Sequence, residues 1–178
     1  MSDGKDARVL RAAALLAAIA LGLCIFLAVH SVSGTAMPGC SAGSGCDSVL
    51  SGRWSKLFGF LPVAALGAGM YLAVLLCLVL RLSGRDGLVE DMVGAVLTFL
   101  CTAILFAALW FIVLQFWKVK AVCPWCMVTH VLGIGLSLLL LCQERPLKLP
   151  AVLAGAGAAG CAFGNQICSG NMPSFAPK

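Results

Sequence analysis

Residues 92–117 read MVGAVLTFLCTAILFAALWFIVLQFW, a run of 26 residues without a charged side chain. A helix needs about 20 apolar residues to cross the hydrocarbon core of a bilayer, so this run predicts a transmembrane helix. Three further uncharged runs, at residues 12–29, 57–80 and 121–142, contain 18, 24 and 22 residues. We therefore expect four transmembrane helices, at about residues 9–29, 57–80, 92–117 and 121–142.

The composition supports an all-α integral membrane protein. Hydrophobic residues make up 61% of the 178 residues and charged residues 11%, with a mean hydropathy of +1.04. A soluble domain carries roughly 25% charged residues. The net charge of +5 is spread along the chain without a basic run, which argues against a nucleic-acid-binding surface.

A weaker apolar stretch extends from residue 149 to about residue 168 and is rich in Ala and Gly, with Asn165 and Gln166 near its end. We expect a fifth transmembrane helix here, followed by a short outer tail, so that residues 149–178 extend a domain at residues 1–148. The sequence GAGAAG at residues 155–160 matches a dinucleotide-binding pattern, but no βαβ unit surrounds it. Small residues at Ala156, Gly160 and Gly164 instead predict a helix-packing face.

The distribution of Lys and Arg favours an N-terminus inside the membrane. In this orientation the inner side receives seven of these residues and the outer side five, a small bias in the expected direction. The loop at residues 30–56 and the link at residues 118–122 then lie outside. The first apolar run is longer than the hydrophobic region of a signal peptide, which favours an uncleaved anchor.

The ten cysteines fall into distinct groups. Four lie inside apolar runs, where cysteine acts as a small hydrophobic residue; these are Cys24, Cys77, Cys101 and Cys142. Four others come together on the outer side under the predicted topology, where disulfides form and persist; these are Cys40, Cys46, Cys123 and Cys126.

The motif Cys123-Pro-Trp-Cys126 is expected at the start of the fourth helix, because proline fits the first helical turn. The helix dipole then favours a thiolate at Cys123. Cys126 lies about 4–5 Å deeper on the same side, so one sulfur meets the aqueous boundary and the other meets the membrane. A structural disulfide and two idle thiols remain as alternatives. A zinc site lacks further ligands, and a c-type haem requires histidine at Met127.

The second pair, Cys40 and Cys46, is separated by Ser-Ala-Gly-Ser-Gly. This loop bends at little cost, and its short disulfide ring is easily opened and remade; a purely structural disulfide is the alternative. A mobile dithiol and a fixed CxxC on one face favour a relay through mixed disulfides. The chain has no room for a nucleotide-binding domain, so we expect a quinone acceptor held between helices beside Cys126.

These motifs resemble the vitamin K epoxide reductase family over about residues 9–143. The ordered set consists of Cys40-x5-Cys46, the segment DSVLSGRW at residues 47–54, Phe58-Gly59, Gly67, Tyr71 and Cys123-Pro-Trp-Cys126-x-x-Thr129. The thiol oxidase DsbB, another four-helix enzyme linked to quinones, has its CxxC before the spaced pair, the reverse of this order.

The resemblance implies a four-helix transmembrane bundle around a quinone pocket, with residues 1–148 as the catalytic domain. It implies a thiol:quinone oxidoreductase in which Cys40 and Cys46 form the shuttle pair that accepts electrons from a thioredoxin-like partner. Cys123 would exchange with this pair. Cys126 would face the quinone and form or approach an adduct with its ring. The quinone would be ubiquinone, menaquinone or a vitamin K type.

Further pocket residues follow from the same resemblance. Ser51, Arg53 and Trp54 match a short lid, although Arg53 and Trp54 are also common as membrane-interface anchors. Vertebrate members carry Asn where this chain has Val63, and Tyr where it has His130. These differences favour a bacterial-type enzyme of the inner membrane, with its redox cysteines facing the periplasm and a separate DsbA-like thiol donor. It would support disulfide-bond formation.

Thr129 and His130, which follow Cys126 in the sequence, are expected to contribute to the pocket. His130 follows Cys126 by four residues on the same helical face and is expected to donate a hydrogen bond or a proton to a quinone oxygen. A histidine satisfied by the backbone is the alternative. Thr129 either contacts the pocket or bonds back along its helix. We also expect Asp47 to cap a helix.

Two readings of the whole chain compete with this one. A vitamin K quinone or epoxide reductase of an endoplasmic reticulum membrane would use the same cysteines. A non-enzymatic membrane redox sensor would exchange disulfides without catalytic quinone turnover. The remaining cysteines, Cys161 and Cys168, receive no chemical role.

Overall fold

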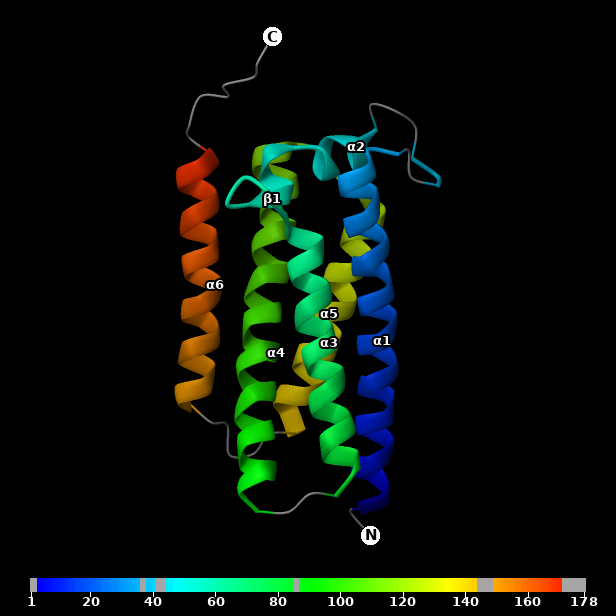
Figure 1. Cartoon of the computed structure of the whole chain (residues 1–178), viewed down its shortest axis with the longest axis vertical. Helices are drawn as coiled ribbons and strands as arrows, with labels where there is room; N and C mark the ends of the chain where they lie inside the picture. Colours follow the sequence, from blue (N-terminus) through cyan, green and yellow to red (C-terminus); the bar gives the residue numbers. More distant parts are fainter. Residues whose placement is uncertain (1–2, 36–37, 41–43, 85–86, 144–148, 171–178) are drawn as a thin grey trace.

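The computed structural model describes residues 3–35, 38–40, 44–84, 87–143 and 149–170. It is built almost entirely from helices (Figure 1). The long helices are α1 (Asp3–Ser33), α3 (Val63–Leu82), α4 (Leu88–Leu114), α5 (Pro124–Gln143) and α6 (Leu149–Gly170). The short elements are α2 (Gly45–Leu50), η1 (Arg53–Ser55), β1 (Lys56–Leu57), β2 (Leu61–Pro62) and the π-helical turn η2 (Gln115–Val119), which continues α4.

Four helices are long and apolar enough to cross a membrane, which confirms the predicted all-α membrane bundle. They span Asp6–Ser33, Val63–Leu82, Leu88–Val119 and Pro124–Gln143. The segment α6 is helical, but it is not among these four candidates. Its Ala, Gly, Asn and Gln residues lower its hydropathy, and its crossing of a membrane stays a prediction.

The four spanning helices form a ring in which α1 packs on α3 and α5, and α4 packs on the same two helices. The inward face of α1 is made mainly of small residues at helical spacing, and these are fully buried at Ala13, Ala17 and Ala20. Small side chains let helix backbones approach closely where lipid supplies no hydrophobic drive to association. The core of the bundle continues through Val74 and Leu78 of α3 to Leu136 and Leu140 of α5.

The second helix begins later than predicted. Helix was expected from residue 57, but Lys56–Pro62 forms a small antiparallel hairpin in which Leu57 pairs with Leu61. Its turn is made by Phe58 and Gly59, both with positive φ angles of 55° and 81°. This left-handed backbone cannot continue into a right-handed helix, so α3 starts at Val63.

The packing face of α6 also differs from the prediction. Gly160 and Gly164 are exposed, and a Cβ atom added at either would meet nothing within 4 Å. The buried small residues are Gly155 and Ala159, and a Cβ on Gly155 would lie 2.5 Å from the Phe99 carbonyl oxygen of α4. The sequence pattern was right about close helix packing and wrong about the face.

The elements that carry the two cysteine pairs lie at one end of the bundle. In Figure 1, α2, the hairpin and the last turn of α6 are at the top, and the N-terminus of the chain is at the bottom. Several expectations fall outside the described residues: the outer tail, the side chain of Cys168, and the basic residues Arg85, Arg145, Lys148 and Lys178.

Candidate functional site

Cys123 lies immediately before α5, as predicted. Pro124 is the first residue of the helix, and the first helical hydrogen bond runs from the Met127 N–H to the Cys123 carbonyl over 3.0 Å. Proline costs nothing there, because the N–H that it lacks would have no helical partner. Contrary to the expectation of an aqueous boundary, however, the Cys123 side chain is 0% exposed.

The pair Cys40 and Cys46 forms a disulfide, with its Cα atoms 6.2 Å apart. The second cysteine is not in a loop, because Cys46 belongs to α2 and is buried. The prediction that Asp47 caps this helix is wrong, since Ser44 occupies the N-cap position and Asp47 lies in the first turn. One half of the pair is therefore anchored in a helix.

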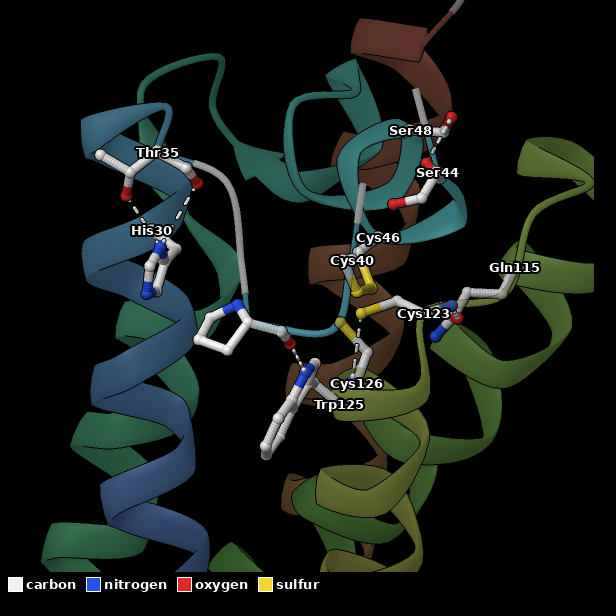
Figure 2. Close-up of a disulfide and its surroundings, with 11 residues drawn as sticks. His30, Thr35, Cys40, Ser44, Cys46, Ser48, Gln115, Cys123, Trp125 and Cys126 are labelled. Carbon is white, nitrogen blue, oxygen red and sulfur yellow. Dashed lines mark hydrogen bonds between the residues drawn. A yellow bond between two sulfur atoms is a disulfide. The ribbon is translucent and has the colours of Figure 1, made fainter. Parts of the chain in front are cut away.

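The two cysteine pairs pack together in one cluster. Cys46 and Cys123 are buried with Leu27 of α1 and Leu50 of α2, and Cys126 packs at the edge of the same group. Figure 2 shows the sulfur of Cys123 between the Cys40–Cys46 disulfide and Cys126. This order is the one that a disulfide relay requires.

A close backbone contact holds the pairs in register. Gly45 precedes Cys46, and a Cβ atom placed on Gly45 would clash with the carbonyl oxygen of Val122, the residue before Cys123. Only glycine allows the two backbones to approach this closely. The glycine was expected to make the loop mobile, but here it serves a close contact at the start of α2.

The Cys123 thiol is more acidic than an ordinary cysteine thiol. A hydrogen bond from the Cys126 thiol lowers the pKa of Cys123 below its ordinary value; burial opposes this by raising the pKa, and the backbone N–H groups of Cys126 and Trp125 lower it further. The Cys126 N–H lies 3.4 Å from the Cys123 sulfur. A thiol of lower pKa also leaves more readily in disulfide exchange, so Cys123 is suited to exchange with the shuttle pair.

Gln115 is a site residue that the sequence analysis missed. It is 2% exposed, and its Oε1 accepts a hydrogen bond of 3.0 Å from the Cys123 N–H (Figure 2). Its backbone carbonyl also accepts the Ala121 N–H at the end of the π-helical turn, a type of distortion that is frequent at functional sites. Gln115 lies eight residues before Cys123 and on another helix. The only sign of its role in the sequence was that it is a polar residue inside an apolar run.

A cavity of about 150 Å³ lies beneath this cluster, between the four spanning helices and the segment that follows α2. Its lining is mostly aliphatic and aromatic, and includes Tyr71 and Gln115, to which we had given no pocket role. All five residues expected in a quinone pocket line it: Cys126, Thr129, His130, Val63 and Trp54. Cys126 therefore faces the cavity, and Cys123 is not among the lining residues.

The individual contacts of these residues are specific. His130 stacks on Phe111, with ring centroids 5.9 Å apart, and among the described residues it has no hydrogen-bond partner. The Thr129 hydroxyl donates to the Trp125 carbonyl over 2.9 Å, so this side chain bonds back along its own helix while it lines the cavity.

The residues expected to form a lid, Ser51, Arg53 and Trp54, lie in η1 or just before it. We call η1 and the hairpin that follows it, residues 53–62, the lid segment; its action as a lid stays a prediction. Trp54 and Ser55 from this segment line the cavity. Arg53 is exposed and does not line it. Ser51, just after α2, donates its hydroxyl to the carbonyl of Asp47 in the first turn of that helix, so its observed contact is with α2.

No group of three or more His, Cys, Asp or Glu side chains able to hold a metal ion occurs in the part of the chain that the structure describes. The reactive groups of this site are paired cysteine side chains next to an apolar cavity.

Comparison with known proteins gives one finding. The model of the vitamin K epoxide reductase family matches residues 11–141, which include both cysteine pairs, the lid segment, two of the spanning helices in full and most of the other two. A search of the curated proteins gave no match.

Proposed function

Because the chain belongs to the vitamin K epoxide reductase family, we propose that it is a membrane thiol:quinone oxidoreductase that receives electrons from a separate thioredoxin-fold protein. The observation that carries this proposal is the division of the CxxC motif. Cys123 packs against the Cys40–Cys46 disulfide, and Cys126 faces the apolar cavity. One turn of helix thus joins a thiol-exchange site to a membrane site.

The relay has three balanced steps. The partner dithiol reduces the Cys40–Cys46 disulfide and leaves as a disulfide. The shuttle dithiol then reduces a Cys123–Cys126 disulfide through a mixed disulfide at Cys123, and the Cys40–Cys46 bond forms again. Finally the Cys123/Cys126 dithiol gives two electrons and two protons to the quinone, which becomes a hydroquinone, and the Cys123–Cys126 disulfide forms again. The arrangement with a shuttle disulfide and free Cys123 and Cys126 corresponds to the point before this last step.

The cavity suits a quinone head group. An apolar cavity of about 150 Å³ holds one benzene ring, and the cavity has this volume. Its walls are formed from helices that face lipid on their other sides, so an isoprenoid tail can remain in the bilayer. Phe111 and Trp54 supply aromatic surface, and Cys126 supplies the reactive sulfur.

The polar groups of the cavity are few, as expected for an orienting set. His130 lines the cavity with no hydrogen-bond partner among the described residues, so its ring N–H is free to donate to a quinone oxygen. Val63 offers no hydrogen bond, and the Thr129 hydroxyl is engaged with Trp125. We therefore assign His130 the hydrogen-bonding role and Val63, Thr129 and Trp54 a shape-defining role.

We place the enzyme in a bacterial inner membrane, with both cysteine pairs facing the periplasm. The prevalence of Lys and Arg at the opposite end supports this orientation. The thiol donor would be a DsbA-like protein, whose oxidised form then introduces disulfides into secreted proteins.

The test uses the full chain purified in detergent, with a reduced DsbA-like protein as donor and ubiquinone or menaquinone as acceptor. Quinone absorbance is followed with time. We expect turnover in the wild type, none in Cys126→Ala, and normal turnover in Cys161→Ala, which removes an exposed free cysteine of α6. Disulfide exchange without turnover of either quinone would overturn the proposal and favour a redox sensor. Turnover with vitamin K epoxide would instead favour the epoxide reductase reading.

A further inference from the structure

Helix α6 carries two amide side chains on its last turns, Asn165 and Gln166, although it lies beyond the family match that ends at residue 141. Gln166 is 2% exposed. A buried amide requires partners for both its oxygen and its nitrogen, because each unpaired polar group costs about 1–3 kcal/mol. The partners of Gln166 therefore indicate what the end of α6 does.

The Gln166 amide joins two other parts of the molecule. Its Oε1 accepts a hydrogen bond of 3.1 Å from the indole N–H of Trp110 on α4. Its Nε2 donates a hydrogen bond of 3.1 Å to the backbone carbonyl of Trp54 in the lid segment. The neighbouring Asn165 accepts the Phe58 N–H at the hairpin turn over 3.3 Å. The start of the lid segment and its hairpin turn are thus bound to α6.

The lid segment has little internal structure to hold it in place. It consists of a three-residue helix and two strands of two residues each, and a two-stranded hairpin is marginally stable alone. Its turn residue Phe58 adopts a positive φ, which is uncommon for a residue other than glycine. The position of this segment therefore depends on its external hydrogen bonds.

Helix α6 is a firm support for these bonds, because it is fixed on α4 along its length. Gly155 allows close backbone approach to Phe99. Nearer the lid, the rings of Phe163 and Trp110 stack with their centroids 4.8 Å apart. The same Trp110 that binds Gln166 therefore also packs against the face of α6.

We propose that Gln166, assisted by Asn165, is a positioning residue that holds the lid segment over the cavity through the Trp54 carbonyl, so that α6 forms part of the quinone site. This inference rests on the proposed function, since it takes the cavity to receive a quinone. Trp54 and Ser55 line the cavity, and their placement then depends on a helix outside the catalytic domain.

Three variants separate the bonds of this amide. Gln166→Leu removes the hydrogen bonds to the Trp110 indole and to the Trp54 carbonyl. Gln166→Glu, measured at alkaline pH where its carboxyl group is ionised, keeps an acceptor for Trp110 but loses the donor to the Trp54 carbonyl. Trp110→Phe keeps the lid bond and loses only the bond to α4. Cys161→Ala, on an exposed position of α6, is the matched control.

The first measurement is hydrogen–deuterium exchange of the detergent-solubilised full chain without quinone, comparing the peptide that covers residues 52–62 with peptides of α5. We expect exchange of the lid peptide to accelerate roughly tenfold in Gln166→Leu and Gln166→Glu, the factor that corresponds to about 1.4 kcal/mol. Trp110→Phe and Cys161→Ala should leave it near the wild-type rate. Unchanged lid exchange in Gln166→Glu overturns the proposal. If Gln166→Leu accelerates exchange in every peptide, it has lost its fold, and Gln166→Glu decides.

The second measurement is steady-state kinetics with ubiquinone carrying a single isoprene unit. We expect KM for this quinone to rise roughly tenfold in Gln166→Glu with kcat nearly unchanged, because the lid shapes the pocket and the sulfur chemistry is intact. A loosened lid with unchanged KM overturns the positioning role. Absence of quinone turnover in the wild type overturns the proposed function instead, and the exchange data still report whether Gln166 holds the lid segment.

Discussion

Replacing Gly45 with alanine should slow electron transfer between the two cysteine pairs. Gly45 and Val122 precede Cys46 and Cys123, and their backbones touch. A Cβ atom at residue 45 would overlap the Val122 carbonyl oxygen and lie 3.2 Å from both the carbonyl carbon and the amide nitrogen of Val122. Since these atoms of Val122 belong to the backbone, they cannot rotate away as a side chain does.

The size of the effect follows from this geometry. Carbon atoms in favourable contact are about 3.5–4.0 Å apart, so α2 must move away from residues 122–123 by about 1 Å. Both groups affected carry a reacting sulfur. A misplacement of about 1 Å can lower the rate of a well-oriented reaction by about 10²-fold. We therefore expect Gly45→Ala to slow reduction of Cys123–Cys126 by the shuttle pair by about this factor.

The assay follows a single internal transfer. Fully oxidised protein in detergent receives limiting dithiothreitol without quinone, and samples are quenched in acid and alkylated. Mass spectrometry then gives the reduced fraction of each cysteine pair with time. The matched control is Gly69→Ala in α3, where an added Cβ meets nothing within 4 Å. If Gly45→Ala is folded, as judged by its thermal midpoint, and reduces Cys123–Cys126 at the wild-type rate, the backbone contact does not position the sulfurs.

Three further predictions concern the same cluster. Cys126→Ala should leave Cys123 in a mixed disulfide with Cys40 or Cys46, detected by non-reducing peptide mapping; a free Cys123 would contradict the order of the relay. Gln115→Leu removes the acceptor of the buried Cys123 N–H and should destabilise the fold by about 1–3 kcal/mol, measured by thermal unfolding, whereas Gln115→Glu keeps the acceptor and should lose less. Because the hydrogen bond from Cys126 lowers the pKa of Cys123, Cys123 in fully reduced protein should become alkylated at lower pH in the wild type than in Cys126→Ala, as mass spectrometry against pH would show; equal midpoints would exclude this bond as the cause.

The spanning helices and the start of α5 were predictable because they depend on local sequence. A bilayer requires a long uncharged run, and a proline after Cys123 places the helix start within one residue. The turn at Phe58 and Gly59 could not be predicted, because an apolar run has the same composition whether it begins with a hairpin or with a helix. The burial of Cys123 was also hidden, since it is caused by α2 and α1, which are distant in sequence.

The contacts of α6 could not be predicted from its own sequence either. Asn165 and Gln166 lower the hydropathy of the segment and therefore read as a weakness in a membrane helix. Their partners Phe58, Trp54 and Trp110 are separated from them by 56 residues or more. A polar residue in an apolar helix is costly unless it is paired, so such residues are better read as evidence of a partner than as the end of a span.

In the proposed relay, the burial of Cys123 would keep thiol exchange with the partner apart from quinone reduction. With 0% of its side chain exposed, its sulfur is out of reach of thiols in solution, and the group that covers it includes Cys46. Cys126 opens to the cavity, which is lined mostly by apolar side chains. In the proposed relay, electrons would therefore pass to the quinone through the shuttle pair, because a shorter route would require a solvent thiol to enter the apolar bundle. If the proposed relay operates, the covering of Cys123 would protect the quinone pool from small thiols and leave the Cys40–Cys46 disulfide as the point of entry.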